Sequence, residues 1–388
     1  MKTKIYITLL TILFAANTFA QSKVEEIELA SKELNQTREI MVYTPNAYEH
    51  NPYTLFNVIY VFDAQNREFF DYASSIANIS KNAGQGTIVV GIKATLIMGD
   101  FEGRNTWVYA RNNDFLPSTT KRLGGRKGNM ENFYKYVKNE VIPYVESNYR
   151  VLPQRMAVGH SLGASFLLYA MTESPDIFDN YVAISPNMKY DNNFILNRLK
   201  SLDINTLNSK KYFYMSHADE GAWGWGESNN EAYTHLRTKL DSEKFEVTIE
   251  EHPEENHMSS FIPALRNAMN NFLDAIQPEW SKELSKETYE VTFRVKVFNE
   301  EDDVYIFGNQ ESLANWQKDK IKMTRVTPFV REYTTKVQNH VEVQFSTDGK
   351  ELGWVSLGGE GNRSNYPMMV SPQKGGTYTF EIVENKPF

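Results

Sequence analysis

The 388-residue sequence contains no cysteine, which excludes disulfide bonds and a lipid-modified cysteine anchor and leaves its stability to packing alone. A surplus of positive charge is also absent, because 41 basic residues stand against 49 acidic ones and the net charge is −8. Nucleic acid is therefore not an expected partner. The sequence has no His-Glu-x-x-His motif and no glycine-rich phosphate loop, so neither a metal ion nor another cofactor is expected.

The apolar run Ile5–Ala16 near the amino terminus is too short to anchor the chain stably in a bilayer. It follows the basic stretch Met1–Lys4 and precedes Ala20, a small residue that suits a cleavage site. We predict a signal peptide over residues 1–20. The mature protein would then be periplasmic or secreted and would have no membrane contact after signal removal.

The next part of the chain has the pattern of an α/β protein. Two nearly continuous apolar runs, 56–62 and 87–92, are typical of strands buried on both faces of a parallel sheet. A helical stretch at 69–79 lies between them, which indicates βαβ units. We expect an α/β domain over residues 21–280. The periodicity is lost at 93–128, which predicts a long loop, either on the substrate side or as a flexible insert, and the length of the loop favours a functional role.

Near residue 285 the pattern changes to short alternating strands separated by Gly, Asn and Asp turns. We predict strands at 291–297, 304–307, 341–345 and 378–382. The residues 286–388 are therefore expected to form an all-β, immunoglobulin-like sandwich.

The stretch 155–170 has the strongest functional pattern in the sequence. A buried strand is predicted to end at Gly159-His160-Ser161-Leu162-Gly163, and an apolar helix follows. A serine on such a sharp strand-to-helix turn has an exposed hydroxyl beside the free N–H groups of the helix terminus. Ser161 is therefore our candidate nucleophile, and the alternative is a turn without chemistry.

A serine nucleophile needs a base and an orienting acid on later loops. His257 lies in a polar loop between the last α/β strand and the final helix, where such a base is expected, and His252 is the weaker alternative. The carboxylates of Asp219 and Glu220 both follow an earlier strand. Either could be the acid, and we favour Glu220.

The oxyanion hole should combine the backbone N–H of Leu162 with one from the loop after the first parallel strand, for which Gln65 is the candidate. Two indoles, Trp223 and Trp225, lie on a glycine-rich segment beside the candidate acid. They could stack on an aromatic or sugar group of a substrate, or pack beneath their own loop.

Five motifs between residues 38 and 273 resemble an esterase family of the α/β-hydrolase fold that includes esterase D, enterobactin-type siderophore esterases and feruloyl esterases. The resemblance implies Ser161 as nucleophile, His257 as base and Glu220 as acid, with Gln65 and Leu162 as oxyanion donors. Two positions differ from many relatives: Ala164 replaces a second glycine, and Ala64 stands where an Asp-Gly pair is common. The motifs are Tyr60–Gln65, Gly159–Ala164, Ser174–Phe178, Ile184–Pro186 and Glu255–Ser259.

The carboxyl-terminal region is similar to starch-binding-type carbohydrate modules, through Val291–Val295, Val304–Asn309 and Leu313–Trp316. This resemblance implies a glycan site at Trp316 and Trp354, whose aromatic faces could pack on sugar rings. A purely structural sandwich is the alternative.

Together these patterns predict an exported serine carboxylic-ester hydrolase, with feruloyl or acetyl esters on a polysaccharide as the preferred substrate class. An enterobactin-type siderophore lactone is the second substrate class. A glycan-binding protein with an inactive hydrolase domain is the alternative from a different functional class.

Overall fold

The computed structural model describes residues 22–50, 52–79, 86–94, 96–101, 104–109, 111–118, 121–122, 126–221, 224–276, 285–318, 320–347, 350–351, 355–356 and 368–382. The predicted signal peptide lies outside these residues, and so do Trp223 and Trp354. Residues 277–284 also lie outside them, so the boundary expected near residue 285 remains a prediction.

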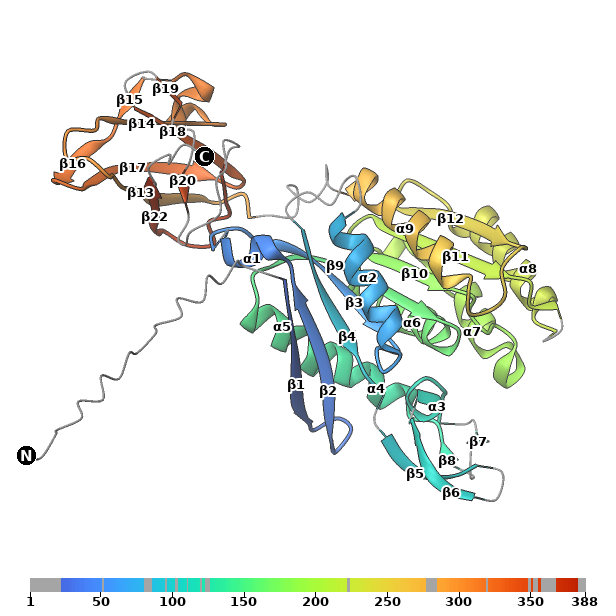
Figure 1. Ribbon diagram of the computed structural model, residues 1–388. Coiled ribbons are helices and arrows are strands. Elements are labelled where there is room, and N and C mark those ends of the chain that lie inside the picture. The colour runs from blue at the N-terminus through green and yellow to red at the C-terminus, as the bar shows by residue number, and fades with distance from the viewer. Residues whose placement is uncertain are drawn as a thin grey trace, which may run out of the picture.

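A mixed sheet forms the centre of the larger unit, and within the described residues it has eight strands (Figure 1). Its first pair of strands is antiparallel and joins the parallel strands along one edge. In spatial order the strands are β1 (Lys23–Ser31), β2 (Gln36–Thr44), β4 (Thr87–Ile92), β3 (Phe56–Phe62), β9 (Val151–His160), β10 (Asn180–Ile184), β11 (Lys211–Ala218) and β12 (Phe245–His252).

Helices cover both faces of this sheet, which explains why its inner strands are continuously apolar. Two apolar clusters result, one on each face. The helices α2 (Arg67–Ile79) and α9 (Phe261–Ile276) pack on one face. The other face carries α4 (Met130–Tyr136), η1 (Val137–Val141), α5 (Ile142–Asn148), α6 (Leu162–Glu173), α7 (Tyr190–Lys200), α8 (Gly226–His235) and η5 (Leu236–Leu240). No helix among the described residues is long and apolar enough to cross a membrane.

The segment after β4 contains more regular structure than the sequence pattern predicted. It forms two short hairpins and one helical turn where we expected a loop without elements. These are β5 (Leu96–Phe101) with β6 (Arg104–Tyr109), α3 (Arg111–Asp114), and β7 (Lys121–Arg122) with β8 (Arg126–Lys127). Shorter elements elsewhere are α1 (Asn46–His50), η2 (Pro175–Ile177), η3 (Ile204–Thr206) and η6 (Glu311–Trp316).

The described carboxyl-terminal residues form two sheets around a separate apolar cluster (Figure 1). This agrees with an all-β unit, and its immunoglobulin-like classification remains a prediction. One sheet contains β16 (Thr324–Thr327), β17 (Val330–Gln338), β13 (Thr288–Lys296), β22 (Gly376–Ile382) and β20 (Val355–Ser356). The other contains β15 (Ile321–Lys322), β14 (Val304–Gly308), β18 (Val341–Thr347), β19 (Lys350–Glu351) and β21 (Met368–Val370).

Tyr53, in the loop before β3, joins the two units. Its ring packs against Tyr378 and Phe380 at centroid distances of 5.0 and 5.7 Å, at the margin of the apolar cluster of the β unit. Its hydroxyl donates to the backbone oxygen of Thr379 and accepts from the Thr379 N–H. A residue of the α/β unit therefore packs against the β-unit core.

Candidate active site

Ser161 lies on a strained turn between β9 and α6. Its backbone has φ 58° and ψ −122°, an unusual conformation for a residue other than glycine. A Cβ atom on Gly159 would lie 2.5 Å from the Gly163 carbonyl oxygen, so only glycine allows strand and helix to approach this closely. The turn holds Ser161 at the carboxyl edge of the parallel strands, directly before the first turn of α6.

His257 lies in the loop between β12 and α9, where the sequence placed the candidate base. Its Nδ1 is 2.7 Å from Oε1 of Glu220, which follows β11. Because a carboxylate only accepts, Nδ1 carries the proton, and Nε2 is the nitrogen that can accept one. The Asn256 side chain shapes the loop by accepting the N–H groups of Met258 and Ser259.

The structure shows which of the two candidate carboxylates, Asp219 or Glu220, lies beside His257. Glu220 is 5% exposed and contacts His257, whereas Asp219 is exposed and its side chain accepts from the Gly221 N–H. The alternative histidine is also separated from this pair, because His252 contacts Tyr214 and Glu250. The geometry therefore brings His257 together with Glu220 rather than with Asp219.

The candidate oxyanion donors lie on neighbouring segments. Leu162 is the first residue of α6, so its N–H has no partner within the helix. The Gln65 side chain donates to Asp63 and accepts from the Ala94 N–H, which fixes the loop after β3 to the end of β4. A Cβ atom on Gly163 would lie 3.1 Å from Oδ2 of Asp63, so this loop packs against the first turn of α6.

An ion pair supports the loop after β3, and no motif in the sequence indicates it. Asp63 is buried with φ 63°, and its two carboxylate oxygens accept from Nε and Nη2 of Arg111 at 2.8 and 2.7 Å. Such bidentate bonds fix a carboxylate in both position and orientation. The left-handed backbone of Asp63 and the position of Gln65 are therefore held by α3.

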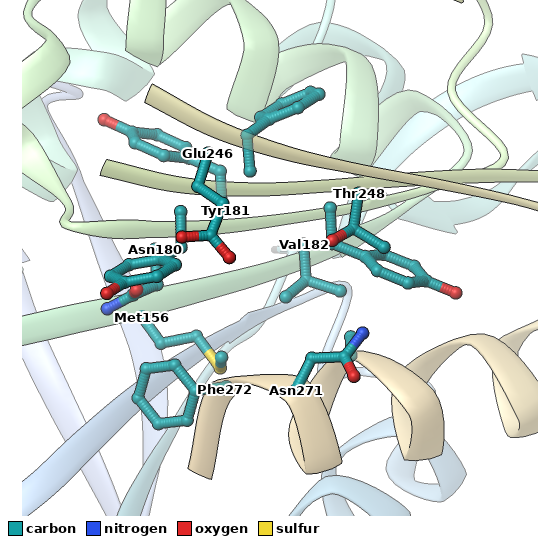
Figure 2. A pocket seen from close by; sticks show the side chains of 12 residues that line it. Met156, Asn180, Tyr181, Val182, Glu246, Thr248, Asn271 and Phe272 are labelled. Atoms are coloured by element: carbon teal, nitrogen blue, oxygen red, sulfur yellow. The ribbon is translucent and has the colours of Figure 1, made fainter. Parts of the chain in front are cut away.

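Two hollows differ in their relation to this edge of the sheet. The larger, of about 550 Å³, adjoins Gln65 and is lined by Ala64, Gln65, Ala94, Lys93, Arg67, Met41, Thr37 and three glutamates, Glu26, Glu28 and Glu39. The smaller, of about 40 Å³, lies between α9 and the amino-terminal halves of β10, β11 and β12 (Figure 2). Only the larger one adjoins the candidate oxyanion loop.

Of the tryptophans singled out from the sequence, two can be located. Trp225 is half-buried, and its ring lies edge-to-face against His257 with the centroids 5.3 Å apart. Trp316 is 39% exposed and packs against Phe307 in the β unit. Trp223 and Trp354 belong to the residues that are not described.

The sequence interpretation missed His160, which precedes the candidate nucleophile. Its imidazole is buried between the ring of His257 and two aromatic rings, Phe69 and Phe261. Burial, with the nearby His257, lowers the pKa of His160 to about 4, so the ring is neutral at pH 7. Within the described ranges, no group of three or more His, Asp or Glu residues could hold a metal ion.

A helix-covered mixed sheet with a serine elbow and a His–Glu pair at one edge defines a hydrolase of mixed α/β fold. Residues 31–325 match the model of the family described as "Putative esterase". The chain therefore belongs to this esterase family. The matched range continues past residue 285 into β16 of the β unit.

Related proteins are consistent with this membership. The chain is 28% identical over 193 residues to the ferri-bacillibactin esterase BesA of Bacillus subtilis, a match that covers 47% of this chain and 65% of BesA. Among solved structures, an IroE-like serine hydrolase from Shewanella oneidensis aligns with a TM-score of 0.52 at 22% identity, over 65% of this chain and 80% of that one. The siderophore hydrolase EstB from Aspergillus nidulans gives 0.54 and 20%, with coverages of 65% and 95%. At these identities the two solved structures show a shared fold.

Proposed function

We propose that this protein is a serine esterase in which Ser161 is the nucleophile, His257 the general base and Glu220 the acid that orients it. The observation that carries the proposal is the 2.7 Å hydrogen bond between His257 Nδ1 and Glu220 Oε1 beside a strained serine elbow. The pair fixes the tautomer in which Nε2 can take a proton.

In the proposed reaction, the Ser161 hydroxyl attacks the ester carbonyl while His257 accepts its proton. The backbone N–H groups of Leu162 and Gln65 stabilise the negative charge that develops on the carbonyl oxygen. His257 then protonates the departing alcohol and leaves an acyl-enzyme. Water, activated by the same imidazole, releases the acid, and Glu220 stabilises the imidazolium in both steps.

A siderophore lactone is the substrate class that we propose first. It is supported by the 28% identity to a relative named for a ferri-bacillibactin ester, over a match that covers 65% of that relative. The sequence patterns alone favour polysaccharide esters over this class.

A feruloyl or acetyl ester on a polysaccharide is the second candidate. It is supported by the β unit, where Trp316 keeps 39% of its surface exposed, as a sugar-stacking residue would. Trp354 is proposed as its partner in a glycan site. Trp225, beside His257, and Trp223 are proposed to contact the acyl group in either case.

Hydrolysis assays on the mature chain test these proposals. The substrates are a ferric catecholate trilactone, methyl ferulate, acetylated xylan and p-nitrophenyl acetate, with Ser161→Ala as the matched control. We expect Ser161-dependent turnover, with the highest kcat/KM on the trilactone. A preference for ferulate or xylan would favour the second candidate, and turnover unaffected by Ser161→Ala would refute the serine mechanism.

Inactivity on all four esters, together with retention on starch in affinity electrophoresis, would instead support a glycan-binding protein with an inactive hydrolase domain. Trp316→Ala is the control for that retention. We also propose that residues 1–20 direct export to the periplasm or medium. Cell fractionation and amino-terminal sequencing test this, with Gln21 as the expected first residue of the mature chain.

A further inference from the structure

The side chain of His160 connects the nucleophile strand to the loop that carries the candidate base. Its Nε2 is 2.6 Å from the backbone carbonyl oxygen of His257. The Ser260 hydroxyl donates to the same oxygen at 3.1 Å. The peptide that follows His257 is therefore held by two hydrogen bonds, one of which comes from the residue next to Ser161.

The direction of this bond follows from its chemistry. A carbonyl oxygen accepts hydrogen bonds and cannot donate, so Nε2 of His160 must carry the hydrogen. The ring is neutral at pH 7, and this hydrogen is then its only N–H proton. A neutral imidazole beside His257, with 4.6 Å between the ring centroids, also avoids repulsion with the imidazolium that forms in the reaction.

We propose that His160 is a positioning residue that fixes the backbone of His257 relative to Ser161. The proposal rests on the roles of Ser161 and His257 in the proposed function. Glu220 fixes the rotation of the His257 ring through Nδ1, but it does not by itself fix the main chain that carries the ring. His160 supplies that second constraint.

The hydrogen bond to the His257 carbonyl comes from the residue directly before the candidate nucleophile, because His160 ends β9 and Ser161 follows it. A displacement of this strand end moves the nucleophile and the donor together, and the hydrogen bond makes the base follow. The aromatic rings of Phe69 on α2 and Phe261 on α9 enclose the imidazole and restrict its orientation. Errors of about 1 Å in such geometry cost about a hundredfold in rate.

Two amides of different length test the proposal. The amide nitrogen of His160→Gln can occupy nearly the same position as Nε2, whereas that of His160→Asn ends about one bond short. We expect His160→Asn to lower kcat on p-nitrophenyl acetate by about 10- to 100-fold with KM within threefold of wild type. His160→Gln should restore kcat to within about threefold of wild type.

His160→Phe, which fills the site without a donor, should behave like His160→Asn. Equal kcat values for the Gln and Asn variants, or a Phe variant as active as wild type, would overturn the proposal. Circular dichroism and melting temperatures of all three variants show whether a loss comes from unfolding, and a loss explained by unfolding in the Asn and Phe variants alike would count against it. If wild type has no Ser161-dependent turnover and a fluorophosphonate does not label Ser161, the proposed function itself fails.

Discussion

The carboxylate beside His257 gives the sharpest test of the site, because Asp219 and Glu220 are consecutive and only one contacts the imidazole. Glu220→Gln removes the negative charge while the size of the side chain is preserved. With charge centres about 4 Å apart and an effective dielectric constant of about 20, the carboxylate stabilises an imidazolium by about 4 kcal/mol. Because the imidazolium forms only during the reaction, this energy should appear as a loss of about three orders of magnitude in kcat.

Asp219→Asn is the matched control, since it makes the same chemical change one residue earlier. Asp219 is exposed, and the kcat of this variant should stay within about twofold of wild type because solvent screens its charge. Steady-state kinetics on p-nitrophenyl acetate measure both variants, and the KM of each should be unchanged. Equal losses in the two variants, or less than a tenfold loss in Glu220→Gln, would refute the assignment.

Three further predictions concern stability. His160 has a pKa of about 4 in the folded protein against 6.5 in the unfolded chain, so the unfolded chain binds more protons below pH 6.5 and stability falls as pH falls. Between pH 7 and pH 5 the protonation of this group in the unfolded chain should lower the unfolding free energy by about 2 kcal/mol, as measured by urea denaturation. His160→Gln should remove this part of the pH dependence, and an equal change of unfolding free energy with pH in both proteins would contradict the prediction. Gly159→Ala should destabilise the protein by about 1–3 kcal/mol and abolish turnover, because the new Cβ would lie 2.5 Å from the Gly163 oxygen. Its control is Gly226→Ala, where a Cβ meets nothing within 4 Å, and equal melting temperatures for the two variants would show that the close approach is unimportant. Tyr53→Phe should lower the unfolding free energy, measured by calorimetry, by about 1–3 kcal/mol because Thr379 loses both of its contacts with the hydroxyl. An unchanged melting temperature would argue against a stabilising contact between the two units at Tyr53.

The α/β framework could be predicted from the sequence because its inner strands are buried on both faces. Phe56–Phe62 and Thr87–Ile92 have the predicted bounds, since a continuous apolar run is itself the consequence of helices on both sides of a sheet. The apolar helix expected after Ser161 is also present, as α6.

Elements without a regular apolar pattern in their sequence could not be predicted in the same way. The helix α7 was missed because Asp191, Asn192 and Asn193 near its start have left-handed backbone angles and interrupt the apolar period. The hairpins of the segment 96–127 are short, and β7 and β8 consist only of Lys and Arg residues. Neither feature leaves the alternating pattern that identifies a strand.

The same distinction applies to the residues of the candidate site. Ser161 and His257 stand in motifs whose spacing reflects the local turn and loop, so the sequence alone singles them out as candidates. The choice between Asp219 and Glu220 depends on which side chain the loop after β11 turns towards His257, and this direction is set by tertiary contacts. His160 had no visible role for the same reason, because its partner is a backbone oxygen 97 residues away in sequence.

The joint at Tyr53 bears on the choice between the two substrate classes. Besides the hydroxyl bonds of Tyr53, Thr54 donates to the Met369 carbonyl oxygen, and the Ser371 N–H donates to that of Tyr53. Strands β21 and β22 are thus both fixed to the loop before β3, so the β unit is held against the α/β unit. A polymer bound at Trp316 would therefore be kept near the esterase at a high effective concentration. A soluble siderophore would gain nothing from that arrangement, so disruption of the contact at Tyr53 should lower turnover only if the substrate is a polysaccharide ester.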